Sequence, residues 1–337
     1  MDHGLWRIYH DDLPDWMRRA MEDPALLRID GVGMNCGCEY TSFPRFRGLQ
    51  PYSRLEHSVG VGLIAWHFTG SAAQGLAGLL HDVASPCFAH VVDFMNGDHL
   101  CQESTEAGTA DIIEASPGLK RLLSDLGLTV ADVADYHVYP IADNDTPRLS
   151  ADRLEYTLGN LVNYGFASMD DIRSIYLDLE VGQGEDGALE LSFRSDAPAR
   201  LFCEGALRCS DIYVSDPDRY AMQALAELLR DAVAAGVIDR QDLWTTEPAI
   251  IARLEADPAF RARWHAFRRM NATESAGSGE GRPASEGWRV VPAKKRWIDP
   301  LVRGVRASQR FPDFAARASA FLARDLEAPV RGFVQNG

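Results

Sequence analysis

Two histidines and two aspartates are placed along this sequence so that they can form one metal site. His57 comes first, the adjacent pair His81-Asp82 follows, and Asp152 comes last. Imidazole nitrogen and carboxylate oxygen suit borderline and hard divalent ions, and a His-Asp pair where the chain leaves a helix can supply two ligands. Such a set leaves positions open for water and a phosphate oxygen. The pattern predicts one divalent ion, with Mn, Fe, Co, Ni and Mg all acceptable.

Each of these residues also has an ordinary structural interpretation. A histidine on an apolar helix face often only bonds a backbone carbonyl. Asp152 falls in the first turn of a predicted helix, where the helix dipole favours a carboxylate without any metal. Asp82, at a helix end, can cap the next turn. The ordered set is more specific than any one member, so the prediction rests on the set and its flanking residues.

Four segments around these residues resemble the HD-domain superfamily of metal-dependent phosphohydrolases. They are Arg54-Leu-Glu-His57-Ser-Val-Gly-Val, Leu-Ala-Gly-Leu-Leu-His81-Asp82, Pro86-Cys-Phe-Ala-His90-Val-Val-Asp93 and Ala151-Asp152-Arg153-Leu-Glu-Tyr156. They look most similar to the branch that hydrolyses deoxynucleoside triphosphates. Lys294-Lys-Arg296-Trp-Ile-Asp-Pro300 is similar to a C-terminal segment of that branch.

The resemblance implies a role for each matching residue. It implies metal binding by His57, His81, Asp82 and Asp152, catalysis by His90 with Asp93, and substrate contacts by Arg54, Arg153 and Tyr156. These roles agree with the chemistry of the side chains. His90 titrates nearest to working pH, and Asp93 at i+3 can orient its ring. Arg54 and Arg153 can hold phosphate oxygens. The implied reaction is hydrolysis of a phosphate ester or anhydride bond of a nucleotide by metal-activated water, without a covalent intermediate. The substrate that the resemblance implies first is a (deoxy)nucleoside triphosphate.

Two departures from the family pattern leave the substrate open. The triphosphohydrolase branch usually has a histidine where this chain has Ser85, and a His-Glu pair where it has Gln102-Glu103. His99 is near these positions in the sequence, but it does not align with either family histidine. The alternatives are therefore a nucleoside monophosphate phosphatase or phosphodiesterase, or a nucleotide-binding sensor without catalysis.

Helical spacing of apolar residues dominates the chain. It predicts helices from His57 to Phe68, over 73–80 and 104–125, and over 150–163 with Ser150 as N-cap. Further helices are expected over 217–236, 243–269 and 311–326. Alternation over 176–181 and 188–193, around glycines, predicts a hairpin. The expected fold is all-α, a mainly helical HD-domain bundle with a small β-hairpin excursion and a C-terminal helical appendage.

The same elements predict four parts of the chain. Residues 1–170 form the HD-domain core with the metal site, and residues 171–270 add the hairpin and a helical extension that completes the pocket. Residues 271–287, rich in Ser, Gly and Glu, are expected to be a mobile loop. Residues 288–337 form a C-terminal segment.

Composition narrows the class of protein further. The chain has 337 residues, 34 basic and 49 acidic, with a net charge of −15 and 46% hydrophobic residues. This excludes a disordered chain and disfavours stable binding to nucleic acid or anionic membranes. The six scattered cysteines and the lack of a signal-like start or of an apolar run of about 20 residues favour a cytoplasmic protein. The resemblance also implies a homo-oligomer, a dimer or larger.

Overall fold

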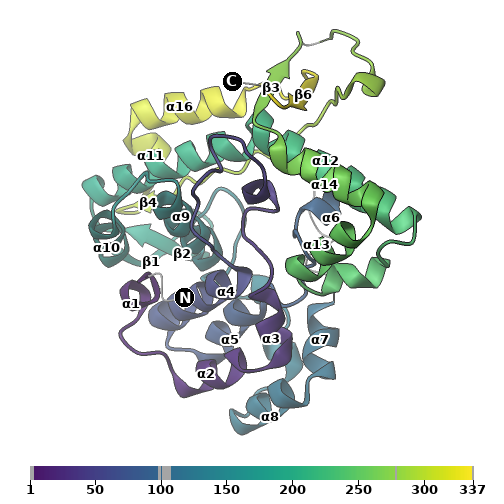
Figure 1. The fold of residues 1–337 in the computed structure, drawn as a ribbon. Coiled ribbons are helices and arrows are strands. Elements are labelled where there is room, and N and C mark those ends of the chain that lie inside the picture. Colours follow the sequence, from purple (N-terminus) through teal and green to yellow (C-terminus); the bar gives the residue numbers. More distant parts are fainter. Residues whose placement is uncertain (1–3, 98–99, 101–107, 278, 336–337) are drawn as a thin grey trace.

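The computed structural model describes residues 4–97, 100, 108–277 and 279–335, and within them the fold is mainly helical, as predicted (Figure 1). The helices are α1 Trp6–Tyr9, α2 Asp15–Met21, α3 Pro24–Ile29, α4 Arg54–Thr69, α5 Ala72–Leu80, α6 Val91–Asn96, α7 Thr109–Ala115, α8 Pro117–Asp125, α9 Ala151–Asn163, α10 Met169–Leu177, α11 Asp196–Tyr213, α12 Asp216–Ala234, α13 Glu247–Ala256, α14 Pro258–Arg269, α15 Ala307–Arg310 and α16 Pro312–Leu322. The strands are β1 Leu179–Gln183, β2 Leu189–Phe193, β3 Ala272–Ser275, β4 Leu301–Val302, β5 Val305–Arg306 and β6 Val330–Phe333.

Helix α4 is the central helix of the fold. A capping box between Ser53 and Glu56 starts it, and every residue from 54 to 65 is buried. Glycines let α5 approach it closely, since a Cβ at Gly62 would lie 2.8 Å from the carbonyl oxygen of Gly75. This close packing holds the start of α4 and the end of α5, where the predicted ligand histidines lie, in one fixed arrangement.

Two hydrophobic cores lie on either side of the molecule. One joins α4, α5, α9, α10 and α11 to the small sheet and α16. The other joins the loop 36–46 to α6, α12, α13 and α14. In Figure 1, α12, α13 and α14 form the right-hand side, and α9, α10 and α11 lie to the left. A site between the two cores can therefore receive side chains from both.

The predicted hairpin exists, but it is part of a larger sheet. Residues 176 and 177 end α10, so the first strand starts at Leu179, later than predicted. β2 also pairs in parallel with β4, Ser192 opposite Leu301, and β4 pairs with β5, so the strand order is β1-β2-β4-β5. The C-terminal segment thus completes the sheet, which local alternation in the sequence did not indicate.

A buried ion pair joins β2 to β5. Arg306 donates to both carboxylate oxygens of Glu190 at 2.7 and 2.8 Å, and to Glu185. The Glu190 side chain is fully buried and that of Arg306 is 10% exposed. Replacing Arg306 by Met should leave Glu190 buried without its partner.

We expect Arg306→Met to lower the free energy of unfolding by about 3 kcal/mol. Urea denaturation measures it. The double variant Arg306→Met with Glu190→Met should recover part of the loss, because both charges are then removed together. Arg310→Met removes an Arg–Asp196 pair at the surface and should change stability much less. An Arg306→Met protein as stable as wild type would show that this pair adds nothing.

Several other predicted elements differ at their boundaries. The stretch 104–125 contains two helices, α7 and α8, which meet at Ser116-Pro117, and its residues 104–107 lie outside the described parts. The stretch 243–269 likewise divides at Asp257-Pro258. In both places proline starts a new helix. Residues 272–275 of the predicted mobile loop 271–287 form β3, paired with β6. The division into four parts stays a prediction.

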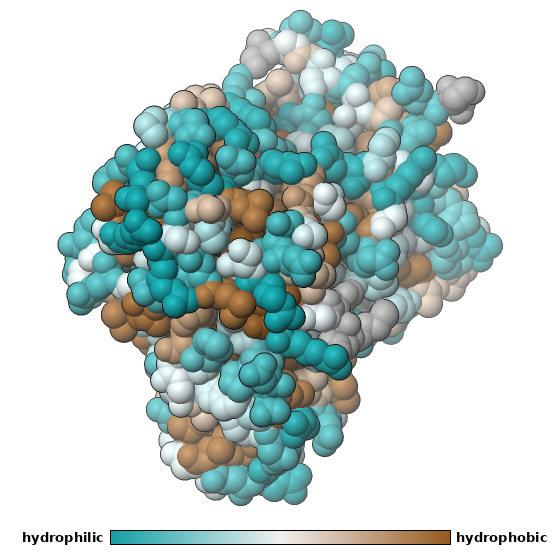
Figure 2. Space-filling model, turned by 90° about the vertical axis from the view of Figure 1, so that its left-hand side faces the viewer, coloured by the Kyte–Doolittle hydropathy of each residue, from teal (hydrophilic) through white to brown (hydrophobic). Residues whose placement is uncertain are grey.

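The face of the molecule in Figure 2 is mostly hydrophilic, and its hydrophobic groups are interrupted by polar ones. Large hydrophobic side chains are exposed at scattered positions of the fold, among them Leu177, Val181 and Val305. In the described parts of the chain, no helix is both long and apolar enough to cross a membrane.

Candidate metal centre

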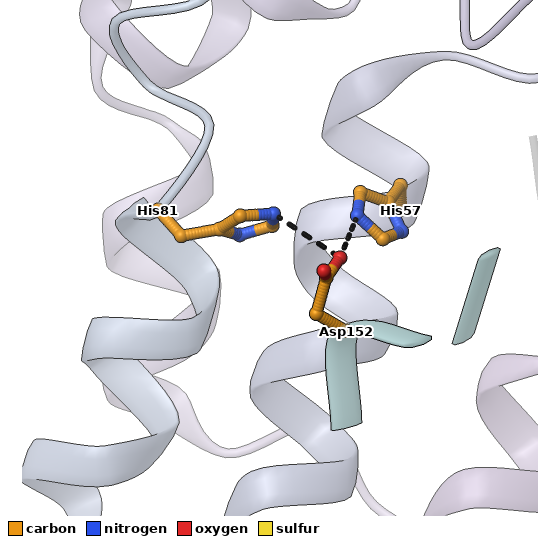
Figure 3. Close-up of side chains that lie close together, drawn as sticks. All are labelled: His57, His81 and Asp152. Atoms are coloured by element: carbon orange, nitrogen blue, oxygen red, sulfur yellow. Dashed lines mark hydrogen bonds and ion pairs between the residues drawn. The ribbon is translucent and has the colours of Figure 1, made fainter. Parts of the chain in front are cut away.

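Three of the four predicted metal ligands converge. His57 comes from the first turn of α4, His81 from the end of α5, and Asp152 from the first turn of α9. One ligand atom from each lies within 4.8 Å of the others. Nε2 of His57 is 3.0 Å and Nε2 of His81 is 3.7 Å from Oδ1 of Asp152, and Figure 3 shows both rings pointing to this carboxylate.

The far side of each imidazole is fixed by an acceptor. Nδ1 of His57 lies 2.6 Å from Oε2 of Glu155, and Nδ1 of His81 lies 2.7 Å from the carbonyl oxygen of Gly78. If each Nδ1–H donates, both Nε2 atoms present their lone pairs to one point, the arrangement typical of metal-binding histidines. Burial lowers the pKa of His57, but hydrogen bonds with Asp152 and Glu155 outweigh it and raise the pKa to about 10. The carboxylates favour positive charge here, and the donor set fits a divalent cation.

Asp82, the fourth predicted ligand, lies beside this group. Its Oδ2 is 3.6 Å from Nε2 of His81. Both carboxylate oxygens accept from Nη1 of Arg54, at 2.8 and 2.7 Å, and Oδ1 also accepts from Ser85 at 2.7 Å. Although burial opposes it, the charge of Arg54 holds the pKa of Asp82 well below its usual range. Asp82 stays ionised beside the cluster, in contact with His81 but not itself one of the three converging ligands, and Ser85 orients it.

His90 and Asp93 form the predicted i, i+3 pair at the start of α6. Nδ1 of His90 lies 2.9 Å from Oδ2 of Asp93, which is fully buried. Phe88 and Ala89, just before, have φ of 59° and 45°, a left-handed conformation that residues with a side chain rarely adopt. Strain of this kind gathers at functional sites, and here it turns the chain so that His90 reaches a cavity.

A cavity of about 870 Å³ lies between the two cores. All the predicted site residues except Asp93 line it. Arg54 is buried and its Nε has no hydrogen-bond partner among the described residues, so an N–H is available to a ligand. The cavity therefore joins the metal centre to a buried donor that suits an anion.

Arg153 and Tyr156 lie on α9 along the wall of the cavity. Arg153 donates to Oδ1 of Asn144 at 2.8 Å and lies 3.1 Å from the carboxylate of Asp143. Burial raises the pKa of Tyr156 to about 12, so its hydroxyl stays protonated and can donate. Both residues are thus where the resemblance implies, although Arg153 has an acidic partner.

The structure places several residues in the site that the predicted site did not include. Glu155 holds His57, and it stands at i+3 from Asp152 on the same helix, a spacing that indicates proximity. At the cavity wall, Nδ2 of Asn160 donates a hydrogen bond to the hydroxyl of Tyr213 at 2.7 Å. Nothing local predicts that pair, because the partners are on α9 and α11. His99 and Gln102-Glu103 lie outside the described residues.

A buried acidic pair supports the opposite wall. Oε1 of Glu247 accepts from the backbone of Gly33 at 2.9 Å and of Phe88 at 3.3 Å, and Oε2 accepts from Tyr40 at 2.8 Å. Burial, and then the charge of Glu247, raise the pKa of Glu39 to about 8. The pair therefore holds a proton near neutral pH while it ties together the loops before α4 and α6.

We expect this pair to make the fold sensitive to alkaline pH. The folded pKa of Glu39, about 8, is above its ordinary 4.5. The stability that this proton contributes is fully present below about 4.5 and is lost as pH rises through about 8. Glu39→Gln should therefore reduce the fall in Tm between pH 6 and pH 9 by a few degrees. An equal fall in both proteins would contradict the assignment.

No model of a protein family matches the chain. Among curated proteins, it is 26% identical over 268 residues to the metal-dependent phosphohydrolase cns2 of Cordyceps militaris, covering 76% of this chain and 73% of the relative. It is 27% identical over 206 residues to the uncharacterized protein YdhJ of Bacillus subtilis, covering 60% and 61%. Among solved structures, a phosphohydrolase from Bacteroides thetaiotaomicron shares the fold with a TM-score of 0.65 at 12% identity, over 96% of this chain and 97% of that one.

The chain shares a mainly helical fold with that phosphohydrolase, and the His-His-Asp cluster is a candidate metal site within this fold. The comparisons confirm the predicted resemblance to HD-type metal-dependent phosphohydrolases and indicate a hydrolase that acts on phosphate esters. The deoxynucleoside triphosphate branch stays a prediction.

Proposed function

We propose that this enzyme removes a phosphoryl group from a nucleotide by attack of metal-activated water. The observation that carries the proposal is the convergence of His57, His81 and Asp152 on the wall of a large cavity. A volume of about 870 Å³ falls within the range of small-molecule sites. Tyr156, Asn160 and Tyr213 line the same cavity and offer aromatic faces and hydrogen bonds to a nucleoside.

In this proposal, separate residues bind the metal, bind the phosphate and accept a proton. His57, His81, Asp82 and Asp152 would hold one divalent ion, which when bound polarises a phosphoryl oxygen and lowers the pKa of its water. Arg54, whose Nε–H has no partner among the described residues, would donate to a phosphate oxygen. Burial lowers the pKa of His90, against its bond to Asp93, and so favours the neutral ring. Its Nε2 can therefore accept the proton of the attacking water.

The charges along the cavity suit a phosphorylated substrate. Among the described residues, the lining includes six cations, Arg54, Arg148, Arg153, Lys294, Lys295 and Arg296, and five aspartates, Asp82, Asp143, Asp145, Asp152 and Asp218. Arg54 is paired with Asp82, and Arg153 with Asp143. With one divalent ion the cavity carries a net positive charge, which suits the negative charge of a phosphorylated substrate.

The test is metal analysis of the purified protein, followed by product identification over a panel of nucleotides with Mn, Co and Mg. Tripolyphosphate released from a deoxynucleoside triphosphate would identify the family's triphosphate chemistry, and orthophosphate released from a nucleoside monophosphate would identify the monophosphatase alternative. Tight nucleotide binding without any phosphate release, with every metal, would support a sensor and contradict the proposal. Homo-oligomer formation and a cytoplasmic location stay predictions from resemblance and composition.

A further inference from the structure

A C-terminal segment, residues 291–299, runs along the cavity. At its start, Nη1 of Arg219 donates to the carbonyl oxygen of Val291 at 2.8 Å. At its end, the backbone N–H of Asp299 donates to the carbonyl oxygen of Pro147 at 2.7 Å. Both ends are therefore fixed to the body of the fold, and residues 293–297 between them line the cavity.

Two adjacent cations of this segment have different partners. The ammonium of Lys295 donates to the carbonyl oxygens of Leu322, at 2.6 Å, and Arg324, at 2.5 Å, at the end of α16. The guanidinium of Arg296 instead reaches His90, with its Nη2 3.3 Å from Nε2 of the imidazole. Lys295 thus anchors the segment to the C-terminal end of a helix, a favourable place for a cation, and Arg296 enters the cavity.

The contact fixes the protonation of His90. A guanidinium donates and never accepts, so Nε2 of His90 must be the acceptor. Nδ1 then carries the proton and donates to Asp93. The charge of Arg296 also acts on Tyr156, across the cavity on α9. Arg296 therefore lies within electrostatic reach of both walls, next to the imidazole that would take the proton of the attacking water.

We propose that Arg296 is a further phosphoryl-binding residue of this enzyme, and that until a phosphoryl group takes up its N–H groups it holds Nε2 of His90 unprotonated. The inference rests on the proposed function. Arg54 and Arg153 are each paired with an aspartate, and Arg296 contacts the imidazole of the proposed base itself. Arginine matches the oxygens of a phosphoryl group with two parallel N–H groups. The predicted site had two arginines on helices, and this segment adds a third from the opposite end of the chain.

Four groups face His90 and set its titration. Asp93 lies on the same helix, Arg54 acts from α4, Arg296 acts from the C-terminal segment, and the Cys36 thiol lies against the backbone of His90. Asp93 favours the charged imidazole, and the two arginines oppose it. Removing Arg296 should therefore make His90 easier to protonate.

The first test is calorimetric binding of inorganic phosphate to the full-length, metal-loaded protein. Arg296→Met should weaken phosphate binding by about 10- to 100-fold, the effect of losing a charge-assisted hydrogen bond. Arg296→Lys should recover part of it, because the charge remains but the paired N–H groups do not. Arg310→Met, which removes a surface cation paired with Asp196, should bind phosphate as wild type does.

The second test is the pH profile of kcat/KM. In Arg296→Met the acidic limb should move to higher pH, because His90 loses a neighbouring positive charge. Arg310→Met removes a cation that is paired with Asp196 and does not line the cavity, so it should not move that limb. This comparison separates the effect of the charge next to His90 from the loss of an arginine elsewhere in the fold.

The outcomes are distinguishable from failure of the proposed function. If wild type releases no phosphate from any nucleotide, the proposed function fails, and phosphate binding alone decides the role of Arg296. If Arg296→Met does not fold, the phosphate affinity of Arg296→Lys decides it. Wild-type phosphate affinity in the variants, or an acidic limb that stays in place in Arg296→Met, would overturn the proposal.

Discussion

Replacing Asp152 by Asn should remove the bound metal and nearly all phosphate release. Oδ1 of Asp152 is the atom that both histidines approach, at 3.0 and 3.7 Å. The amide keeps the shape of the side chain but removes the negative charge that attracts the cation. We expect the loss in kcat/KM to exceed the roughly 10- to 100-fold effect of residues that only support a ligand. Metal analysis and kinetics on the same preparation measure both quantities.

Asp170→Asn is a matched control for this variant. Asp152 and Asp170 are both the second residue of a helix, α9 and α10, and each helix begins after a serine N-cap. Each carboxylate gains about 0.3–1 kcal/mol from the helix dipole, so that loss is common to both variants. Asp170 is exposed and does not line the cavity. Full metal content and activity in Asp152→Asn would contradict its role as a ligand.

Replacing Glu155 by Gln should weaken metal binding although Glu155 is not itself a predicted ligand. Glu155 is buried and holds Nδ1 of His57 at 2.6 Å, and its carboxylate also accepts from the hydroxyls of Tyr52 and Tyr9. A neutral amide is a poorer acceptor for the imidazole N–H and lowers the basicity of its Nε2. We expect metal affinity to fall by about 10- to 100-fold, measured by titration of metal-free protein.

Tyr52→Phe is a control that separates the orientation of the metal ligand His57 from the overall stability of the fold. It removes a hydrogen bond to Glu155 but keeps the bond between Glu155 and His57. We expect it to lower the free energy of unfolding by about 1 kcal/mol, with metal affinity close to wild type. If Glu155→Gln binds metal as tightly as wild type, Glu155 has only a structural role.

The parts of the site predicted from sequence are those set by local rules. Ser150 caps α9 as expected, which places Asp152 in the first helical turn. The i, i+3 spacing of His90 and Asp93 does bring the pair together. Helices α4 and α5 follow from apolar spacing, and packed glycines between them bring His57 toward His81. Spacing along one helix is sufficient for the first two relations, and the third also needs the packing of α4 against α5.

What the sequence did not predict depends on residues far apart in the chain. The parallel pairing of β2 with β4 joins Ser192 to Leu301, and no local pattern encodes it. Arg296 reaches His90 across 206 positions of the sequence. Asp82 was predicted as a ligand, and its engagement by Arg54 appears only when α4 and α5 are packed together.

The most direct measurement is a crystal structure of the protein grown with manganese, with anomalous differences recorded to locate the ion. The expected result is one anomalous peak bound by His57, His81 and Asp152, with Asp82 at the fourth protein position. An anomalous peak held by other residues, or none at this cluster in a protein that releases phosphate with manganese, would contradict the assignment of the metal centre.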